Sequence, residues 1–251
     1  MGLFDIFKRK EETIKADRLV IEDEEGEEPE PEDEVEEEEF EKEAPEDRAE
    51  AGPLDVEEYE GDAPVIDLGA LRVPARQGLS LRLEFEEKTK RVIAVGLDMA
   101  GSTLQVQAFA APRSSGLWRD VRTRLAQQVE KQGGSAEEQD SVLGTSLRTS
   151  VPVAKGDSKA RVVRFYGVDG PRWFLRGVVT GPATGDEERL EQLLELFRGI
   201  VVVRGTKPIP PKDLLPLTVP KVMAEQMAAA AAKRRAAEAG DGRTDGGAGR
   251  S

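Results

Sequence analysis

Hydrophobic and polar residues alternate along several stretches in the middle of the chain. In Leu79–Phe85 apolar side chains occupy every second position, and Thr103–Phe109 repeats this pattern. A period of two is typical of strands that cover a core with one face. Val92–Leu97 lies between them as a continuous apolar run, which indicates a strand covered on both faces. The three stretches predict an antiparallel meander.

Two other stretches have helical spacing. A segment after Ser114-Ser115 has one apolar face, ends at Gly133-Gly134 and predicts a helix near Ser115–Gln132. The serines are its expected N-caps. Thr184–Glu187 matches a capping box and opens a second predicted helix, Asp186–Arg198, which has a leucine-rich stripe. The residues that we expect to share one core are Trp118, Leu125, Leu193, Phe197 and Val202.

Arg161–Thr180 contains two valine-rich runs on either side of Asp169-Gly170. That dipeptide favours a two-residue hairpin turn, and such a turn would pair Tyr166 with Trp173. Further strands are predicted at Val142–Val153, at Arg161–Tyr166 and at Ile200–Val203. Arginine and aromatic residues gather on the hairpin, and five of them form our candidate interaction surface: Arg161, Phe165, Arg172, Phe174 and Arg176.

Charge divides the chain into regions. Residues 22–50 hold 19 Asp and Glu against Lys42 and Arg48, a net charge of −17 in a chain of −14. Such a composition cannot offset the entropy lost on ordering, so we expect a disordered acidic arm over 22–62 that serves as a solvating spacer. The alternative is an arm that mimics nucleic acid or folds back on a basic surface. Residues 64–220, with a net charge of +5, are expected to fold as one α+β domain with a mostly antiparallel sheet and two principal helices.

The ends of the chain carry their own patterns. Residues 1–21 begin with an apolar and basic peptide, which is either a weak membrane or docking anchor or an unstructured start. Residues 221–251 are rich in alanine, so we expect a helix-prone segment followed by a disordered tail. The chain contains no run long enough to span a membrane.

The chain has no cysteine and no histidine. This excludes disulfides, thiolate nucleophiles, imidazole acid–base catalysis and Cys/His zinc sites. Gly167–Gly170 is neither a Walker loop nor a dinucleotide fingerprint. We therefore expect no catalytic residues, no metal and no cofactor.

Several strings in the chain resemble an uncharacterised domain family of actinobacterial proteins. They are GALRVP (69–74), the segment 104–118 that includes FAAPRSSGLW, GVDGPRWFLRG (167–177), ELFRGIVVVRG (195–205) and DLLPL (213–217). The resemblance covers about 53–220 and implies a single domain with two flexible ends in a bacterial cytoplasm. It supplies no functional residues. The order of strands and helices is also similar to the small α/β/α sandwiches related to PsbP and Mog1.

Three function classes follow from these observations. A non-catalytic protein-interaction or adaptor module, acting in the cytoplasm through an unknown protein partner, accounts for most of them. The alternative is a nucleic-acid or polyanion binder that uses the basic and aromatic hairpin face and is regulated by the acidic arm. A carboxylate-based enzyme is the third and has the least support.

Overall fold

The computed structural model describes residues 40–152, 160–221, 223–225 and 229. Its contacts separate the unit Met1–Leu217 from the unit Thr218–Ser251. In the second unit, residues 221, 223–225 and 229 are helical. The expected N-terminal peptide, 1–21, lies outside the described residues, as does most of the expected tail, 221–251. All elements discussed below belong to the first unit.

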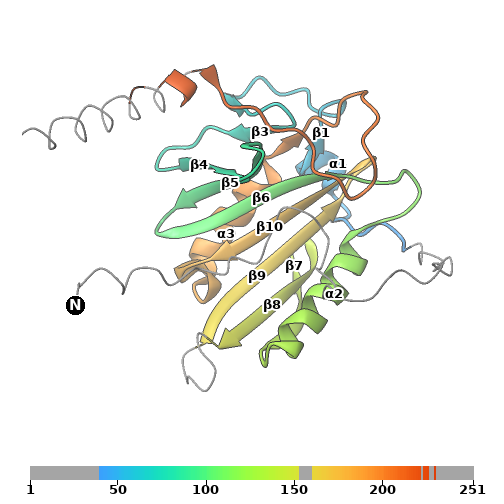
Figure 1. Ribbon diagram of the computed structural model, residues 1–251, viewed down its shortest axis with the longest axis vertical. Helices are drawn as coiled ribbons and strands as arrows, with labels where there is room; N and C mark the ends of the chain where they lie inside the picture. Colours follow the sequence, from blue (N-terminus) through green and yellow to red (C-terminus); the bar gives the residue numbers. More distant parts are fainter. Residues whose placement is uncertain (1–39, 153–159, 222, 226–228, 230–251) are drawn as a thin grey trace, which may run out of the picture. The chain divides into compact units, whose positions relative to one another are not determined.

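A seven-stranded sheet runs through the first unit (Figure 1). Every neighbouring pair of its strands is antiparallel, which confirms the expected sheet type. In spatial order the strands are β4 (Ser80–Phe85), β5 (Val92–Met99), β6 (Ser102–Ala110), β10 (Trp173–Thr180), β9 (Ala160–Asp169), β8 (Gly144–Pro152) and β7 (Ser135–Ser141).

Two helices of more than one turn, α2 (Trp118–Lys131) and α3 (Glu187–Arg198), cover opposite faces of this sheet. This confirms the α+β class with two principal helices. Trp118 of α2 packs in one hydrophobic cluster, whereas Leu193 and Phe197 of α3 pack in another. The prediction of one shared core is therefore wrong, because the sheet lies between the two clusters.

Strand β10 shows how the sheet builds both cores. Leu175 faces the cluster with α3, and the neighbouring Phe174 faces the cluster with α2. Phe174 is fully buried and stacks against Phe109 at 5.9 Å and Trp118 at 6.1 Å between ring centroids. Gly167 permits this packing, since a Cβ atom there would lie 2.3 Å from the Trp118 ring. Alternation along one strand thus supplies both sides of the fold.

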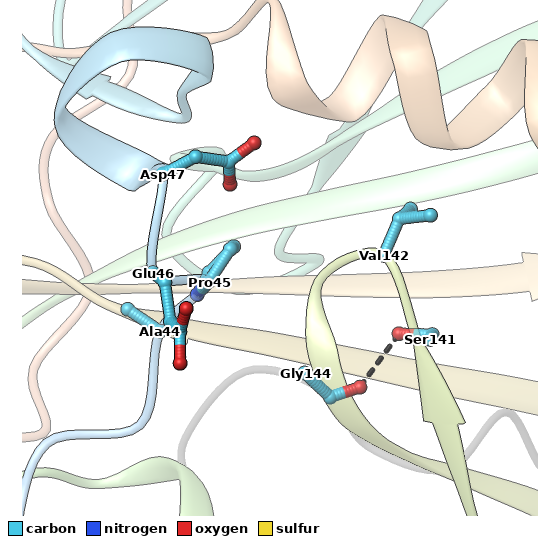
Figure 2. Close-up of a pocket in the computed structure, with 7 residues that line it drawn as sticks. All are labelled: Ala44, Pro45, Glu46, Asp47, Ser141, Val142 and Gly144. Carbon is cyan, nitrogen blue, oxygen red and sulfur yellow. Dashed lines mark hydrogen bonds between the residues drawn. The ribbon is translucent and has the colours of Figure 1, made fainter.

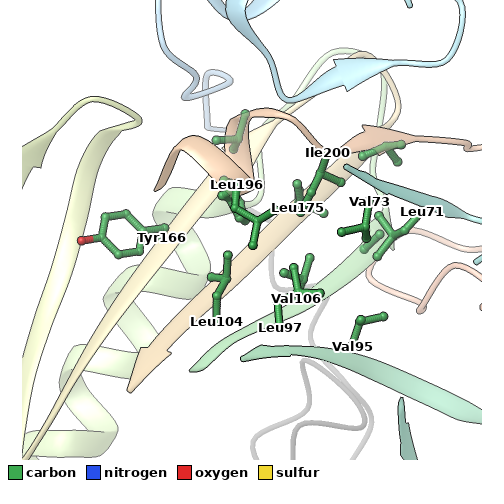
Figure 3. Close-up of a cluster of buried hydrophobic side chains, with 14 of the residues drawn as sticks. Leu71, Val73, Val95, Leu97, Leu104, Val106, Tyr166, Leu175, Leu196 and Ile200 are labelled. Carbon is green, nitrogen blue, oxygen red and sulfur yellow. The ribbon is translucent and has the colours of Figure 1, made fainter. Parts of the chain in front are cut away.

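A smaller sheet extends the α3 side of the molecule. Its order is β1 (Leu54–Asp55), β11 (Val201–Val202), β3 (Leu71–Pro74) and β2 (Val65–Asp67), and β1 pairs with β11 in parallel. A one-turn helix, α1 (Arg48–Ala51), precedes β1, and a 3₁₀ helix, η1 (Pro182–Thr184), precedes α3. Figure 3 shows Leu71 and Val73 of β3 in the same cluster as Leu175 and Leu196.

The extended segment 213–217 lies beside the end of β6. Leu215 N–H donates to Ala108 O at 2.8 Å, and Ala110 N–H donates to Asp213 O at 2.8 Å. Leu214 packs against the α2 cluster, while Leu215 packs in the α3 cluster. The leucines between the prolines therefore fix this segment to both cores.

The predicted hairpin turn is wrong in its register. Phe174 pairs with Asp169 and Gly177 pairs with Tyr166, and Gly170 N–H donates to Trp173 O at 2.8 Å. Residues Gly170–Arg172 therefore connect the two strands, and the turn lies two residues further along the chain than predicted. The pairing shifts by an even number of positions, so every strand residue keeps the face that alternation assigns to it.

Local signals also failed at two helix starts. Helix α2 begins without a side-chain cap from Ser114 or Ser115. Helix α3 is capped by Asp186, whose carboxylate accepts from Arg189 N–H at 3.1 Å, whereas Thr184 belongs to η1. Strand β7 was missed altogether, because its sequence SAEEQDS has almost no apolar residues to alternate.

Candidate functional site

The five residues of the candidate interaction surface do not form one surface. Phe165 and Phe174 are 4% and 0% exposed, because α2 covers them. Arg161 is exposed at the start of β9, while Arg172 lies in the β9–β10 connection. Aromatic rings buried in this way offer no platform for stacking bases, which removes the main support for nucleic-acid binding through the hairpin face.

The fifth residue, Arg176, is a buried guanidinium. Its Nη2 donates to Gln107 Oε1, its guanidinium carbon lies 5.8 Å from the Phe109 ring centroid, and its Nε has no hydrogen-bond partner in the described structure. Burial lowers the pKa of Arg176 to about 10. The side chain is therefore an interior group and contacts no solvent-facing ligand site.

Asp169 has a larger role than the turn residue that the sequence indicates. Its side chain is buried, and its carboxylate accepts hydrogen bonds from Leu117 N–H at 2.8 Å and from Trp118 N–H at 3.3 Å. It thus satisfies amide groups at the start of α2, in place of the expected serines. A third amide, Glu43 N–H, donates to the same carboxylate at 3.0 Å. Burial raises the pKa of Asp169, and the three amides oppose that shift.

That third amide belongs to an ordered part of the expected acidic arm. We call residues Phe40–Asp47 the strap. The strap is attached by main-chain hydrogen bonds from Gly116 N–H to Phe40 O at 2.7 Å and from Asp169 N–H to Glu43 O at 2.9 Å. A Cβ atom at Gly116 would lie 2.6 Å from Glu41 O, so only glycine permits this approach.

Side chains add specificity to the strap contacts. Arg122 of α2, whose side chain is 7% exposed, pairs with Glu43 at 2.5 Å and with Glu138 of β7 at 2.7 Å. Burial lowers and the two carboxylates raise the pKa of Arg122, and the carboxylates prevail. The guanidinium of Arg119 lies 5.2 Å from the Phe40 ring centroid.

The opposite side of the strap contacts the β9–β10 connection. Lys42 Nζ donates to Gly170 O at 2.7 Å and to Pro171 O at 2.6 Å. Burial lowers the pKa of Lys42, an effect that the nearby Asp169 carboxylate partly offsets. Contacts on both sides therefore hold Phe40–Glu43 against the domain, ahead of the turn at residues 46–47.

The expectation of disorder over 22–62 is therefore wrong for 40–62, while 22–39 lies outside the described residues. The acidic charge of this part is met by specific cations: Glu43 by Arg122, Asp47 by Arg198 at 3.0 Å, and Glu58 by Arg48 at 2.6 Å. The net charge of the arm does not reveal these partners. Arg122 and Arg198 lie far away in the sequence, and Arg48 meets Glu58 only in the folded chain.

Beyond Glu43 the strap borders an open cavity of about 440 Å³. Figure 2 shows Ala44, Pro45, Glu46 and Asp47 on one side and the β7–β8 turn on the other. Arg198 joins the two sides, since Nη1 donates to Asp47 and Nη2 donates to Val142 O. The Val142 side chain at the turn is 59% exposed. The cavity thus offers an apolar residue beside two exposed acids.

Glu58 makes a pH-dependent contribution to the stability of the segment that joins α1 and β1. Hydrogen bonds from Arg48 lower the pKa of Glu58 below its usual value of 4.5, while burial opposes the shift. The associated stability is present above pH 4.5 and is lost as the pH falls through the lowered value in the folded state. We expect E58Q to remove this part of the acid dependence of the urea midpoint, whereas E57Q, at an exposed position, leaves the dependence unchanged. Identical acid profiles for E58Q and the unmodified chain would contradict the assignment.

The described part of the chain holds no group of three or more acidic side chains placed to bind a metal ion. Within the same residues, no helix is both long and apolar enough to cross a membrane. What the strap site can do is bind an extended peptide through paired main-chain groups, an arginine pair on α2 and a buried carboxylate.

A family profile described as "Protein of unknown function (DUF3710)" matches residues 52–226. The chain belongs to this family. No curated protein matches its sequence. Among solved structures, the chain is similar to the solution structure of cyanobacterial PsbP (CyanoP) from Synechocystis sp. PCC 6803, at 13% identity. That match covers 57% of this chain and 95% of the other, with a TM-score of 0.33.

The DUF3710 match confirms the family resemblance predicted from the strings in the sequence. It begins at residue 52, so the strap lies before the matched region. The main sites that recognise the strap, Gly116, Arg122 and Asp169, lie within it.

Proposed function

We propose that this DUF3710 protein is a non-catalytic protein-interaction module that acts in the bacterial cytoplasm. The observation that carries the proposal is the strap, because the domain holds an extended peptide by main-chain hydrogen bonds and side-chain contacts. Extended peptides of partner proteins are recognised by the same combination, in which main-chain bonds give affinity and side chains give specificity.

The residue pattern of the strap indicates what such a partner presents. Phe40 contacts Arg119, Lys42 contacts two carbonyl oxygens, and Glu43 pairs with Arg122. A partner segment with the pattern Phe-x-Lys-Glu would make the same contacts in the same extended conformation. The strap itself occupies the site in the isolated protein, and its covalent attachment gives it a high effective concentration.

A binding experiment in trans tests this proposal. The receptor is the full chain carrying F40A and E43A, which removes two of the three side-chain anchors of the strap and leaves the residues of the site unchanged. The probe is a fluorescent peptide with the sequence of residues 38–48, measured by anisotropy. We expect saturable binding to this receptor and much weaker binding to the unmodified chain, whose own strap competes.

Two variants of the F40A/E43A receptor separate specific from general attraction. R122Q removes the buried partner of Glu43 and should weaken binding by about tenfold or more, because charge-assisted hydrogen bonds are the strong ones. R124Q on the same helix changes a guanidinium that pairs with Asp120 and is 51% exposed, so binding should be unchanged.

Equal affinities of R122Q and R124Q, or no binding by either, would argue against the proposal. Single-stranded RNA provides a further comparison. If it binds the F40A/E43A receptor and the peptide does not, the polyanion interpretation replaces the peptide one.

A further inference from the structure

A second cavity, of about 230 Å³, lies apart from the strap contacts. Three segments line it: residues 55–57 after β1, residues 171–172 in the β9–β10 connection, and residues 203–206 after β11. Two interactions bring them together. Val56 N–H donates to Val202 O at 3.0 Å, and Trp173 Nε1 donates to Asp55 Oδ2 at 2.8 Å.

Two arginines of this cavity carry like charges. Arg204 donates through Nη1 to Lys207 O at 3.0 Å and through Nη2 to Ile209 O at 3.4 Å, and these acceptors are neutral carbonyls. Its Nε is buried and has no hydrogen-bond partner in the described structure. Burial lowers the pKa of Arg204, and the charge of Arg172 lowers it further. Both residues line the same cavity, and the charge of Arg172 acts on the Arg204 guanidinium.

Neither arginine is neutralised by the described part of the chain. No ion pair joins Arg172 or Arg204 to a carboxylate of the described residues. The backbone of Arg172 is nevertheless fixed, because Ala111 N–H donates to Arg172 O at 3.0 Å. Two guanidinium groups beside one cavity, neither with a carboxylate partner among the described residues, favour an anion there.

The acids in the lining do not cancel these charges. Asp55 accepts from the Trp173 indole and from Glu57 N–H at 3.0 Å, and its charge acts on Arg48, whose pKa it helps to raise. Glu57 is exposed at the rim, where water screens its carboxylate. Neither acid forms an ion pair with Arg172 or Arg204, so the guanidinium of Arg172 is not occupied by a carboxylate of the described residues.

We propose that the cavity of Arg172 and Arg204 binds a small oxyanion, a phosphate or carboxylate group. This site goes beyond the proposed peptide binding, since the strap uses Arg119 and Arg122 on α2. The guanidinium of Arg172, which forms no ion pair with the described residues, would supply the donors, and the charge of Arg204 beside the same cavity would add to the attraction. A guanidinium is suited to this role because its planar fork matches two oxygens of the anion.

Titration of the full chain with inorganic phosphate, and separately with acetate, at constant ionic strength tests the site. The readout is the side-chain Nε–Hε resonance of arginine in ¹⁵N NMR spectra, with calorimetry for affinity. We expect a saturable shift of the Arg204 signal with a Kd of about 1 mM or tighter. Preference for phosphate or for acetate identifies which oxyanion the site takes.

R172Q is the decisive variant, because Arg172 makes no side-chain hydrogen bond or ion pair with the described residues and its loss should leave the fold intact. It should weaken binding by about tenfold or more. R161Q, which changes an exposed arginine at the start of β9, is the matched control and should bind as the unmodified chain does. Absence of saturation with both anions, or equal weakening by R172Q and R161Q, would overturn the proposal.

Discussion

Replacing Asp169 with alanine is expected to lower the free energy of unfolding by about 3–5 kcal/mol, since each buried donor left without an acceptor costs about 1–3 kcal/mol. Without the carboxylate, the amides of Leu117 and Trp118 remain buried at the start of α2 with no acceptor. The amide of Glu43 loses its acceptor as well. Urea denaturation followed by circular dichroism measures the change.

Two controls make the Asp169 result specific. D140A removes an exposed carboxylate from β7 and should change stability by less than about 0.5 kcal/mol. D169N keeps one acceptor oxygen and the size of the side chain, so its cost should lie between those of D169A and D140A. A D169A variant as stable as D140A would show that the carboxylate does not cap α2.

The F174A variant is expected to lose about 3–5 kcal/mol, the usual cost of a phenylalanine-to-alanine change in a core. Phe174 is fully buried between Phe109 and Trp118, so its removal leaves a cavity that neither the sheet nor α2 can fill without moving. The near-UV circular dichroism of Trp118 should weaken at the same time, because that ring loses its stacking partner.

F85A provides the comparison for F174A. Phe85 is 36% exposed on the edge strand β4, so its truncation should cost less than about 1 kcal/mol. Similar losses for the two phenylalanines would mean that the α2 face of the sheet is not the closed core described above.

Much of the sheet was predictable because burial imposes a period of two on its central strands. The faces of Phe174 and Leu175 follow from alternation alone, and they hold despite the wrong register of the hairpin. Register depends on the position of the turn, and the Asp169-Gly170 signal placed the turn two residues too early. Asp169 is instead held by tertiary contacts that local turn preferences do not contain.

The candidate site was the hardest part to predict. Clustering of arginine and aromatic residues in sequence indicates a surface, but α2 covers Phe165 and Phe174. The ordered strap was not predicted, because its acids find partners such as Arg122 and Arg198 only in the folded chain. The signal that was present is the change in composition at Phe40 and Lys42, the first aromatic and the first basic residue within the acidic run.

Amide hydrogen exchange at Glu43 in the unmodified full-length chain tests the docked strap most directly. Its N–H donates to the buried Asp169 carboxylate, and its carbonyl accepts from the Asp169 amide. We predict that this amide exchanges far more slowly than the same residue in a free peptide of residues 38–48, and that D169A abolishes most of the difference. Exchange at the rate of the free peptide would mean that the strap does not dock, and would contradict the peptide-binding site built on it.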